Sequence, residues 1–169
     1  SIQALSNHSD SFLIMGPTGK DTDFIFKGTP EEKIRHGTES LIRTAQAANA
    51  LEVPTVVGYP GVENWGRFFF FPYGEGWSEY EEQFAERFTP ILNKFQEYGV
   101  RFAIEIHPNS FVYDINTALR ALELVDYHPA LRYNFHPANT LYLTTDPAVL
   151  IDTLKERMYH AHAKDAEPA

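Results

Sequence analysis

The sequence contains no cysteine, and this absence excludes several kinds of site at once. Disulfide-stapled folds, thiolate zinc sites and cysteine nucleophiles all require the thiol group. Basic residues are also few, because 14 Lys and Arg stand against 23 Asp and Glu, which gives a formal net charge of −9. A protein of that charge repels the phosphate backbone, so we expect no nucleic-acid partner.

Long hydrophobic runs are missing as well. No apolar stretch approaches the roughly 18 residues that a membrane-spanning helix needs, and no charged-then-apolar signal segment opens the chain. We therefore expect no membrane partner and a cytoplasmic location. The composition is typical of globular proteins, with 43% hydrophobic, 22% charged and 14% aromatic residues. The length of 169 residues predicts a single domain over residues 1–169.

Short apolar runs alternate with segments of helical periodicity along the whole chain. The apolar runs, which we predict to be strands, are Ile2–His8, Thr55–Tyr59, Arg101–His107, Leu131–His136 and Met158–His162. Strands that alternate with helices form parallel sheets, because each helix returns the chain to the end of the sheet from which it started. Two architectures fit this pattern, an open doubly wound sheet and a (β/α)8 barrel.

The helical segments carry clear start and stop signals. Thr29-Pro30-Glu31-Glu32 is a capping box with proline at the first helical position, and we predict that Ser78 caps a second helix in the same way. Gly99 stands where the residue after a helix end is expected. Asp114 and Asp146 are the predicted N-caps of two further helices.

Motifs and length together favour the barrel. The chain has no G-x-G-x-x-G turn of a dinucleotide-binding fold, and the Gly-Pro-Thr-Gly-Lys segment at 16–20 lacks the first glycine of a phosphate loop, since position 14 is Ile. A complete barrel takes about 250 residues, so five of its eight units need about 156. We predict part of a (β/α)8 barrel. Its open sheet edges lead us to expect a homo-oligomer or a part of a longer chain.

Histidines mark the carboxyl ends of the predicted strands. Five of the seven, His8, His107, His136, His160 and His162, lie at or near these ends. In parallel α/β folds this edge of the sheet carries the active site. A single histidine is more often a surface or core residue than a ligand, but five at one edge favour a metal site. Imidazoles together with a carboxylate suit Mn²⁺, Fe²⁺, Co²⁺ or Zn²⁺.

Glu105 supplies a carboxylate inside an apolar strand pattern. Alternation along a strand puts Glu105 and His107 on the same face, toward the mouth of the barrel. The same rule puts His160, His162 and Lys164 on one face of the last predicted strand. A buried ion pair with Arg or Lys is the alternative interpretation of the carboxylate, and a structural pair is the alternative for the two histidines.

Three segments resemble one known family. Glu-Ile-His-Pro at 105–108, Asn-Phe-His-Pro-Ala-Asn at 134–139 and Tyr-His-Ala-His-Ala-Lys-Asp at 159–165 are similar to successive strand ends of the xylose isomerase-like barrels. These barrels include sugar isomerases, ketose 3-epimerases, inosose dehydratases and endonuclease IV. The resemblance covers nearly the whole chain and implies one divalent metal ion, held by Glu, Asp, His and Glu on strands five to eight. It makes Glu105 and His162 metal ligands.

The sequence departs from the family pattern at several positions. His136 stands where the family usually has Asp, and Asn139 stands where many members have a substrate-contacting His. The last Glu ligand and barrel strands one, two and eight are not found in the 169 residues. The resemblance then implies a metal site of Glu105, His136 and His162. We expect Mn²⁺ there, with Mg²⁺, Co²⁺ and Zn²⁺ as alternatives and loss of the metal as a further one.

The resemblance implies a metal-dependent sugar isomerase or epimerase that removes a proton next to a carbonyl and passes through an enediolate. We expect Glu105 to be the base, with His107 as the alternative, and a small sugar or sugar derivative as the partner. The expected substrate-binding residues are His8, Trp65, Phe69, Asn139 and Lys164. A lyase or dehydratase acting on a keto-sugar or inositol derivative is the second hypothesis. A non-catalytic barrel fragment or subunit is the third, while the acidic charge argues against cleavage of DNA.

Overall fold

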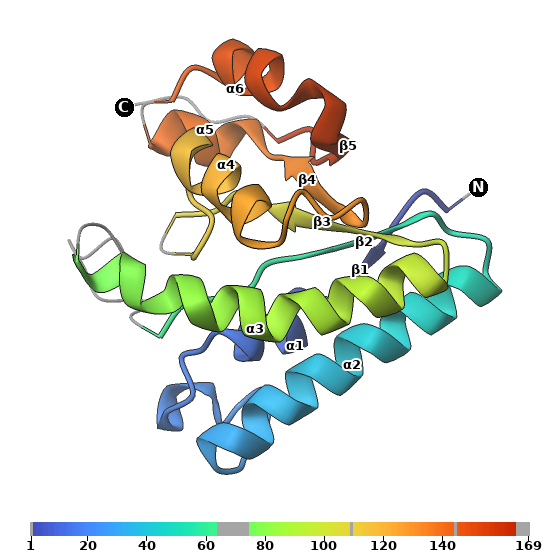
Figure 1. Cartoon of the computed structure of the whole chain (residues 1–169), viewed down its shortest axis with the longest axis vertical. Coiled ribbons are helices and arrows are strands. Elements are labelled where there is room, and N and C mark those ends of the chain that lie inside the picture. The colour runs from blue at the N-terminus through green and yellow to red at the C-terminus, as the bar shows by residue number, and fades with distance from the viewer. Residues whose placement is uncertain (1, 64–74, 109, 144, 165–169) are drawn as a thin grey trace.

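Five parallel strands form a curved sheet that is half of a barrel (Figure 1). The computed structural model describes residues 2–63, 75–108, 110–143 and 145–164. The strands follow each other across the sheet in the order in which they occur in the chain, and each pairs in parallel with its neighbour. They are Leu5–Ser6 (β1), Thr55–Gly58 (β2), Arg101–Glu105 (β3), Leu131–Phe135 (β4) and Met158–Ala161 (β5).

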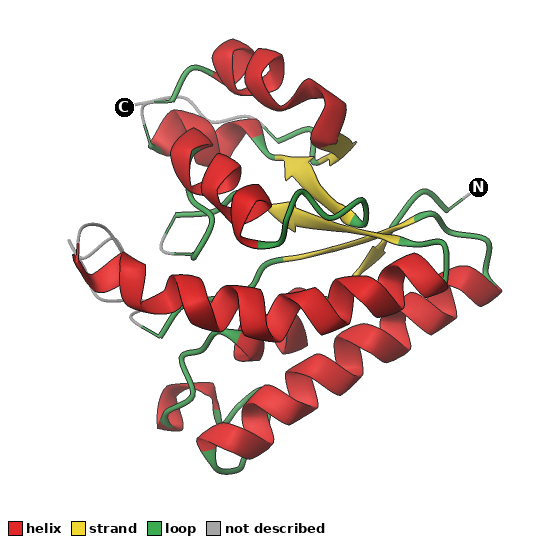
Figure 2. Cartoon of the chain, in the orientation of Figure 1, coloured by secondary structure: helices red, strands yellow, loops and turns green. Residues whose placement is uncertain are grey.

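Helices cover the outer face of this sheet (Figure 2). Two long helices, Pro30–Ala50 (α2) and Glu75–Glu97 (α3), pack against each other beside β2 and β3. Ile115–Leu124 (α4) and Pro147–Leu154 (α6) lie on the side of β4 and β5. The short helices are His8–Ser11 (α1) and Pro137–Tyr142 (α5), with 3-10 turns at Phe12–Ile14, Lys20–Thr22 and Lys155–Arg157. None of the helices in the described ranges is long and apolar enough to cross a membrane.

The core lies between the strands and the long helices. Phe102 and Ile104 of β3 are fully buried, and Phe88 and Phe95 of α3 place their ring centroids 5.9 and 5.6 Å from that of Phe102. Glu105 points to the other face of β3, where it meets polar side chains of β4 and of the segment after β5. The predicted alternation along this strand is therefore confirmed, and it separates an apolar outer face from a polar inner face.

The predicted strands β2 to β5 are confirmed to within two residues at each end. The first prediction was too long, because the run Ile2–His8 yields only the two-residue strand β1. Asn7 ends this strand: its side chain accepts a hydrogen bond from the Ser11 backbone N–H at 3.0 Å and so caps α1. Asparagine is among the best N-cap residues, and a cap at position 7 stops the extended chain there.

Most of the predicted helix signals are confirmed. Thr29 and Glu32 cap each other's backbone, Asp114 and Asp146 are N-caps, and Gly99 follows the end of α3 with φ at +66°. The predicted cap at Ser78 is wrong, because α3 already begins at Glu75 and position 78 lies inside the helix. Serine is tolerated inside a helix, so its sequence motif alone does not fix a start.

Candidate active site

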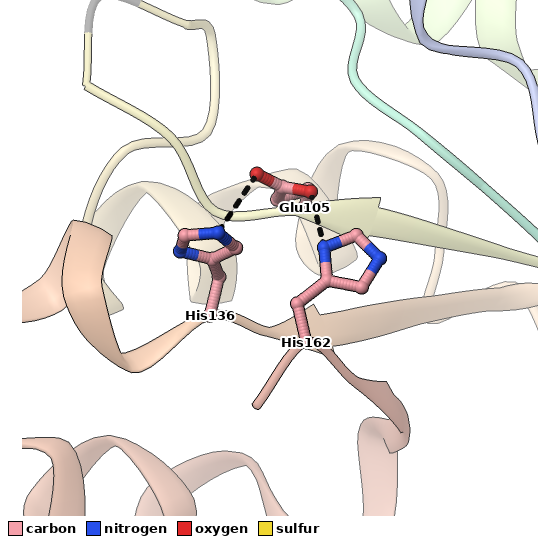
Figure 3. A group of neighbouring side chains, drawn as sticks. All are labelled: Glu105, His136 and His162. Carbon is pink, nitrogen blue, oxygen red and sulfur yellow. Dashed lines mark ion pairs between the residues drawn. The ribbon is translucent and has the colours of Figure 1, made fainter. Parts of the chain in front are cut away.

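Glu105, the last residue of β3, lies at the centre of a polar cluster at the carboxyl end of the sheet. Its side chain is buried, and its Oε2 atom lies 3.0 Å from Nε2 of His8 and 3.0 Å from Nδ1 of His162. Its Oε1 atom lies 4.0 Å from Nε2 of His136. Figure 3 shows the carboxylate facing the rings of His136 and His162. Residues from the ends of four strands thus meet around one carboxylate.

Two asparagines, one in β4 and one in Pro137–Tyr142 (α5), donate hydrogen bonds to the same carboxylate. Asn134, in β4, donates from Nδ2 to Oε2 of Glu105 at 3.2 Å, and this Nδ2 lies 3.1 Å from Nδ1 of His162. Asn139, in α5, donates to Oε1 of Glu105 at 3.1 Å and to the Ile106 carbonyl at 3.1 Å. Both carboxylate oxygens therefore accept hydrogen bonds that fix their positions.

The electrostatics of the cluster keep the carboxylate charged. Burial alone would raise the pKa of Glu105, but the hydrogen bond to His8 and the charges of His8, His136 and His162 outweigh it and lower the pKa to about 2. Burial lowers the pKa of His107 and also that of His136. The ionised carboxylate is the form in which this side chain binds a metal ion.

Glu105, His136 and His162 form a group that could hold a divalent metal ion, with one ligand atom from each residue within 4.8 Å of the others. Two ligands of one ion are at most about 4.2 Å apart at a bond length of about 2.1 Å. The separations of up to 4.8 Å are close to this limit. In addition, the buried Oδ1 atom of Asn134 has no hydrogen-bond partner among the described residues. The donor set fits a divalent cation that accepts nitrogen and oxygen ligands.

The other predicted catalytic residue, His107, lies two residues beyond β3. Its Nδ1 atom is 2.7 Å from the carbonyl oxygen of Pro108, and its ring stacks on Tyr59 with centroids 5.3 Å apart. The carbonyl can only accept, so Nδ1 carries the proton and Nε2 is the basic nitrogen. Lys164 is exposed, and its charge lowers the pKa of His107 less than burial and the charge of His8 do.

The remaining predicted residues differ in their relation to Glu105. His8 and Asn139, which were expected to bind substrate, contact the carboxylate directly. His160 contacts the ring of His162 at 5.5 Å between centroids, so it belongs to the edge of the cluster. Trp65 and Phe69 lie outside the described residues, and their assignment stays a prediction.

Sequence reasoning missed Asn134 and Tyr59. The signal for Asn134 was present, because Arg132, Asn134 and His136 alternate with apolar residues along β4 and so share its inner face. Tyr59 follows β2 at the same edge of the sheet as the histidines, and its ring lies 5.0 Å from that of His8. Burial raises the pKa of Tyr59, as does the charge of Glu105.

Comparison with known proteins places this geometry in context. The family described as xylose isomerase-like TIM barrel matches residues 4–169. A search of curated protein sequences finds no match. Among solved structures, the probable 3-DHS dehydratase AsbF from Bacillus anthracis has a TM-score of 0.68 at 20% identity, over 96% of this chain and 50% of that chain.

Two further solved structures have the same fold. The 3-keto-D-glucoside 4-epimerase from E. coli has a TM-score of 0.71 at 11% identity, over 95% of this chain and 57% of that one. The IOLI protein with a bound zinc atom has a TM-score of 0.59 at 16% identity, over 81% of this chain and 47% of that one. The chain thus spans about half the length of the solved structures it matches.

Proposed function

Because the chain belongs to the xylose isomerase-like TIM barrel family, we propose that the cluster around Glu105 is the metal-dependent site of a sugar isomerase or epimerase. The observation that carries this proposal is the buried carboxylate at the carboxyl end of a parallel sheet, with two imidazoles placed to share a cation with it. Similarity to an epimerase structure supports the same class of reaction.

Glu105, His136 and His162 would hold the divalent ion. When bound, the ion acts as a Lewis acid that polarises the carbonyl of the sugar and makes the neighbouring C–H group more acidic. We propose Mn²⁺ for this role, with Zn²⁺ as the alternative, because a zinc atom is bound in one solved structure of the same fold. Asn134 and Asn139 keep the carboxylate of Glu105 in place for this purpose.

We propose His107, rather than Glu105, as the base that moves the proton. Both oxygens of Glu105 accept hydrogen bonds from asparagine side chains, and its role as a metal ligand uses a further lone pair, which leaves less capacity to accept a proton. His107 carries its proton on Nδ1 against the Pro108 carbonyl, so Nε2 is the basic nitrogen of the ring. A histidine base near neutral pH suits abstraction of a proton next to a carbonyl and formation of an enediolate of the substrate.

Deuterium exchange tests this proposal. The Mn²⁺-loaded protein is incubated in D2O with a panel of ketoses, aldoses and keto-sugars, and NMR follows the C–H group next to the carbonyl. We expect deuterium at that carbon for at least one sugar, and a rate lowered by about 10²–10⁴-fold in His107→Gln. Arg120→Gln, at an exposed ion pair on the outer helices, is the control and keeps the full rate. Absence of exchange across the panel in the metal-loaded protein would overturn the proposal.

A dehydratase is the second candidate, and two observations favour it. A probable dehydratase has the same fold, and His136 gives the site one negative charge fewer than the Asp that the family resemblance implies at that position. The same proton abstraction would then be followed by loss of a leaving group on the next carbon. The NMR spectra of the exchange experiment distinguish the two reactions, because elimination creates a double bond conjugated to the carbonyl.

A further inference from the structure

A lysine buried in α2 holds a loop beside the candidate active site. Lys33 is fully buried, and its Nζ atom donates to the Gly19 carbonyl, to Oγ1 of Thr22 at 3.0 Å and to Oδ1 of Asp23 at 2.7 Å. An ammonium group has three donors, and burying it is costly unless they are paired. The three contacts pair all of them and fix the loop that precedes α2 in one position.

The fixed loop presents an exposed aromatic ring. Phe24 follows Asp23 directly, and its side chain is 85% exposed to solvent. It lines a pocket of about 190 Å³ next to the polar cluster. We call this the Phe24 pocket, and its lining residues are His8, Ser9, Phe12, Phe24, Ile25 and Tyr59.

The Phe24 pocket borders the candidate active site. His8 lines the pocket and also contacts Oε2 of Glu105 at 3.0 Å. Tyr59 lines the pocket too, and its ring packs edge-on against His8 and stacks on His107. The rings of His8 and Tyr59 therefore lie between Glu105 and the pocket, and a substituent that extends past them from a ligand at Glu105 would enter it.

We propose that the Phe24 pocket binds an aromatic ring that the substrate carries as a substituent, so that the substrate class is an aryl-substituted sugar. This inference rests on the proposed function, because it takes the sugar to lie at Glu105. The volume fits, since an engineered apolar cavity of about 150 Å³ holds one benzene molecule. Three of the six lining residues are Phe or Tyr, which gain additional energy from ring contacts.

The chemistry of the lining argues against a phosphate group as the occupant. No Lys, Arg, Asp or Glu lines the Phe24 pocket among the described residues, and the lining residues with polar side-chain atoms are His8, Ser9 and Tyr59. A phosphate site requires cationic side chains or several backbone donors. An aryl group instead covers exposed apolar surface. Removing about 55 Å² of such surface from water improves the affinity about tenfold.

Calorimetric titration with two glycosides tests the inference. The dissociation constants of phenyl and methyl β-D-glucopyranoside are measured on the metal-loaded full chain, its Phe24→Ser variant and a Leu51→Ser control. Leu51 is a similarly exposed apolar side chain, 59% exposed, at the end of α2. We expect phenyl glucoside to bind about tenfold more tightly to the unmodified chain. The preference is lost in Phe24→Ser and kept in Leu51→Ser.

The remaining outcomes separate the pocket from the sugar site. Equal binding of both glucosides to the unmodified chain overturns the pocket and leaves the proposed function intact. If neither glucoside binds, ¹⁹F NMR with 4-fluorophenol probes the pocket alone. Binding that disappears in Phe24→Ser then supports the pocket and places the failure in the sugar assignment, while no binding overturns the pocket. A change in oligomeric state in Phe24→Ser assigns the surface to a second copy of the chain and also overturns it.

Discussion

The two ends of the inner sheet face carry polar side chains of opposite charge. At the carboxyl end, the Glu105 carboxylate is surrounded by polar side chains from the ends of three other strands, β1, β4 and β5. At the amino end, the guanidinium groups of Arg101 and Arg132 lie 4.9 and 4.8 Å from the ring centroid of Tyr159. Neither arginine forms an ion pair with a carboxylate of the described residues. Strands β3 and β4 contribute to both ends, so the same alternation produces two different environments.

The two ends differ in the contacts that stabilise their charged side chains. The carboxyl end is built from short side chains whose atoms are fixed by hydrogen bonds, which is the preorganisation that a metal or catalytic site needs. The amino end is built from long cationic side chains that stack on an aromatic face, where contacts are less directional. Charge with fixed geometry, rather than charge alone, therefore identifies the candidate site.

The size of a cavity does not identify the candidate active site in this protein. A cavity of about 620 Å³ lies along β5 and the start of β2. Glu105 is not among its lining residues, which include Tyr159 and His160. Its lining comes from both edges of the sheet: Gln3 precedes the edge strand β1, and residues 158–161 form the edge strand β5. The titratable groups with fixed partners instead gather around Glu105 at the carboxyl end of the sheet.

Replacing Glu105 has the largest expected effect on this comparison. In Glu105→Gln the site loses its anionic ligand, so we expect the affinity for Zn²⁺ and Mn²⁺ to fall more than about a hundredfold. This loss is larger than the one caused by mutating residues that only hydrogen-bond to a metal ligand. Arg101→Gln changes one residue at the amino end of the same strand and keeps the affinity. Isothermal titration with each metal ion measures both. Full metal occupancy in Glu105→Gln would show that the ion does not bind at this carboxylate.

Acid should destabilise the folded protein through the carboxyl end of the sheet. The pKa of Glu105 is lowered from 4.5 to about 2, so its ionised form stabilises the folded state above pH 4.5. This stability is lost as the pH falls through the range toward 2, and the shift corresponds to roughly 3 kcal/mol. Urea unfolding of the metal-free protein at several pH values measures it. Glu105→Gln should abolish this acid-dependent part, and an unchanged pH profile in the variant would contradict it.

The strand and helix pattern could be predicted from the sequence because it depends on local periodicity and caps. The gathering of Glu105, His136 and His162 also followed from a local rule, since parallel strands end at one edge. Lys33 could not be predicted as a buried residue, because its burial depends on a loop that folds back onto α2. Phe24 was missed for the same reason, as its position is set by the contacts of that loop.

The smallest expected effect concerns the amino end, and it tests whether the two ends are independent. Tyr159 is 44% exposed, and Arg132 lowers its pKa by hydrogen bonding while the charges of Arg101 and Arg132 add to this. Tyr159→Leu removes the aromatic face under both guanidinium groups, which at an exposed site costs about 0.5–1 kcal/mol of unfolding free energy. Tyr159→Phe keeps that face and should cost less, so the difference between the two variants in urea unfolding isolates the ring contact.

Metal affinity should be unchanged in both variants, because hydrogen bonds at the other end of the sheet fix Glu105. A fall in metal affinity in Tyr159→Leu alone would mean that the stacked arginines help to position β5, and the two ends would then form one coupled site.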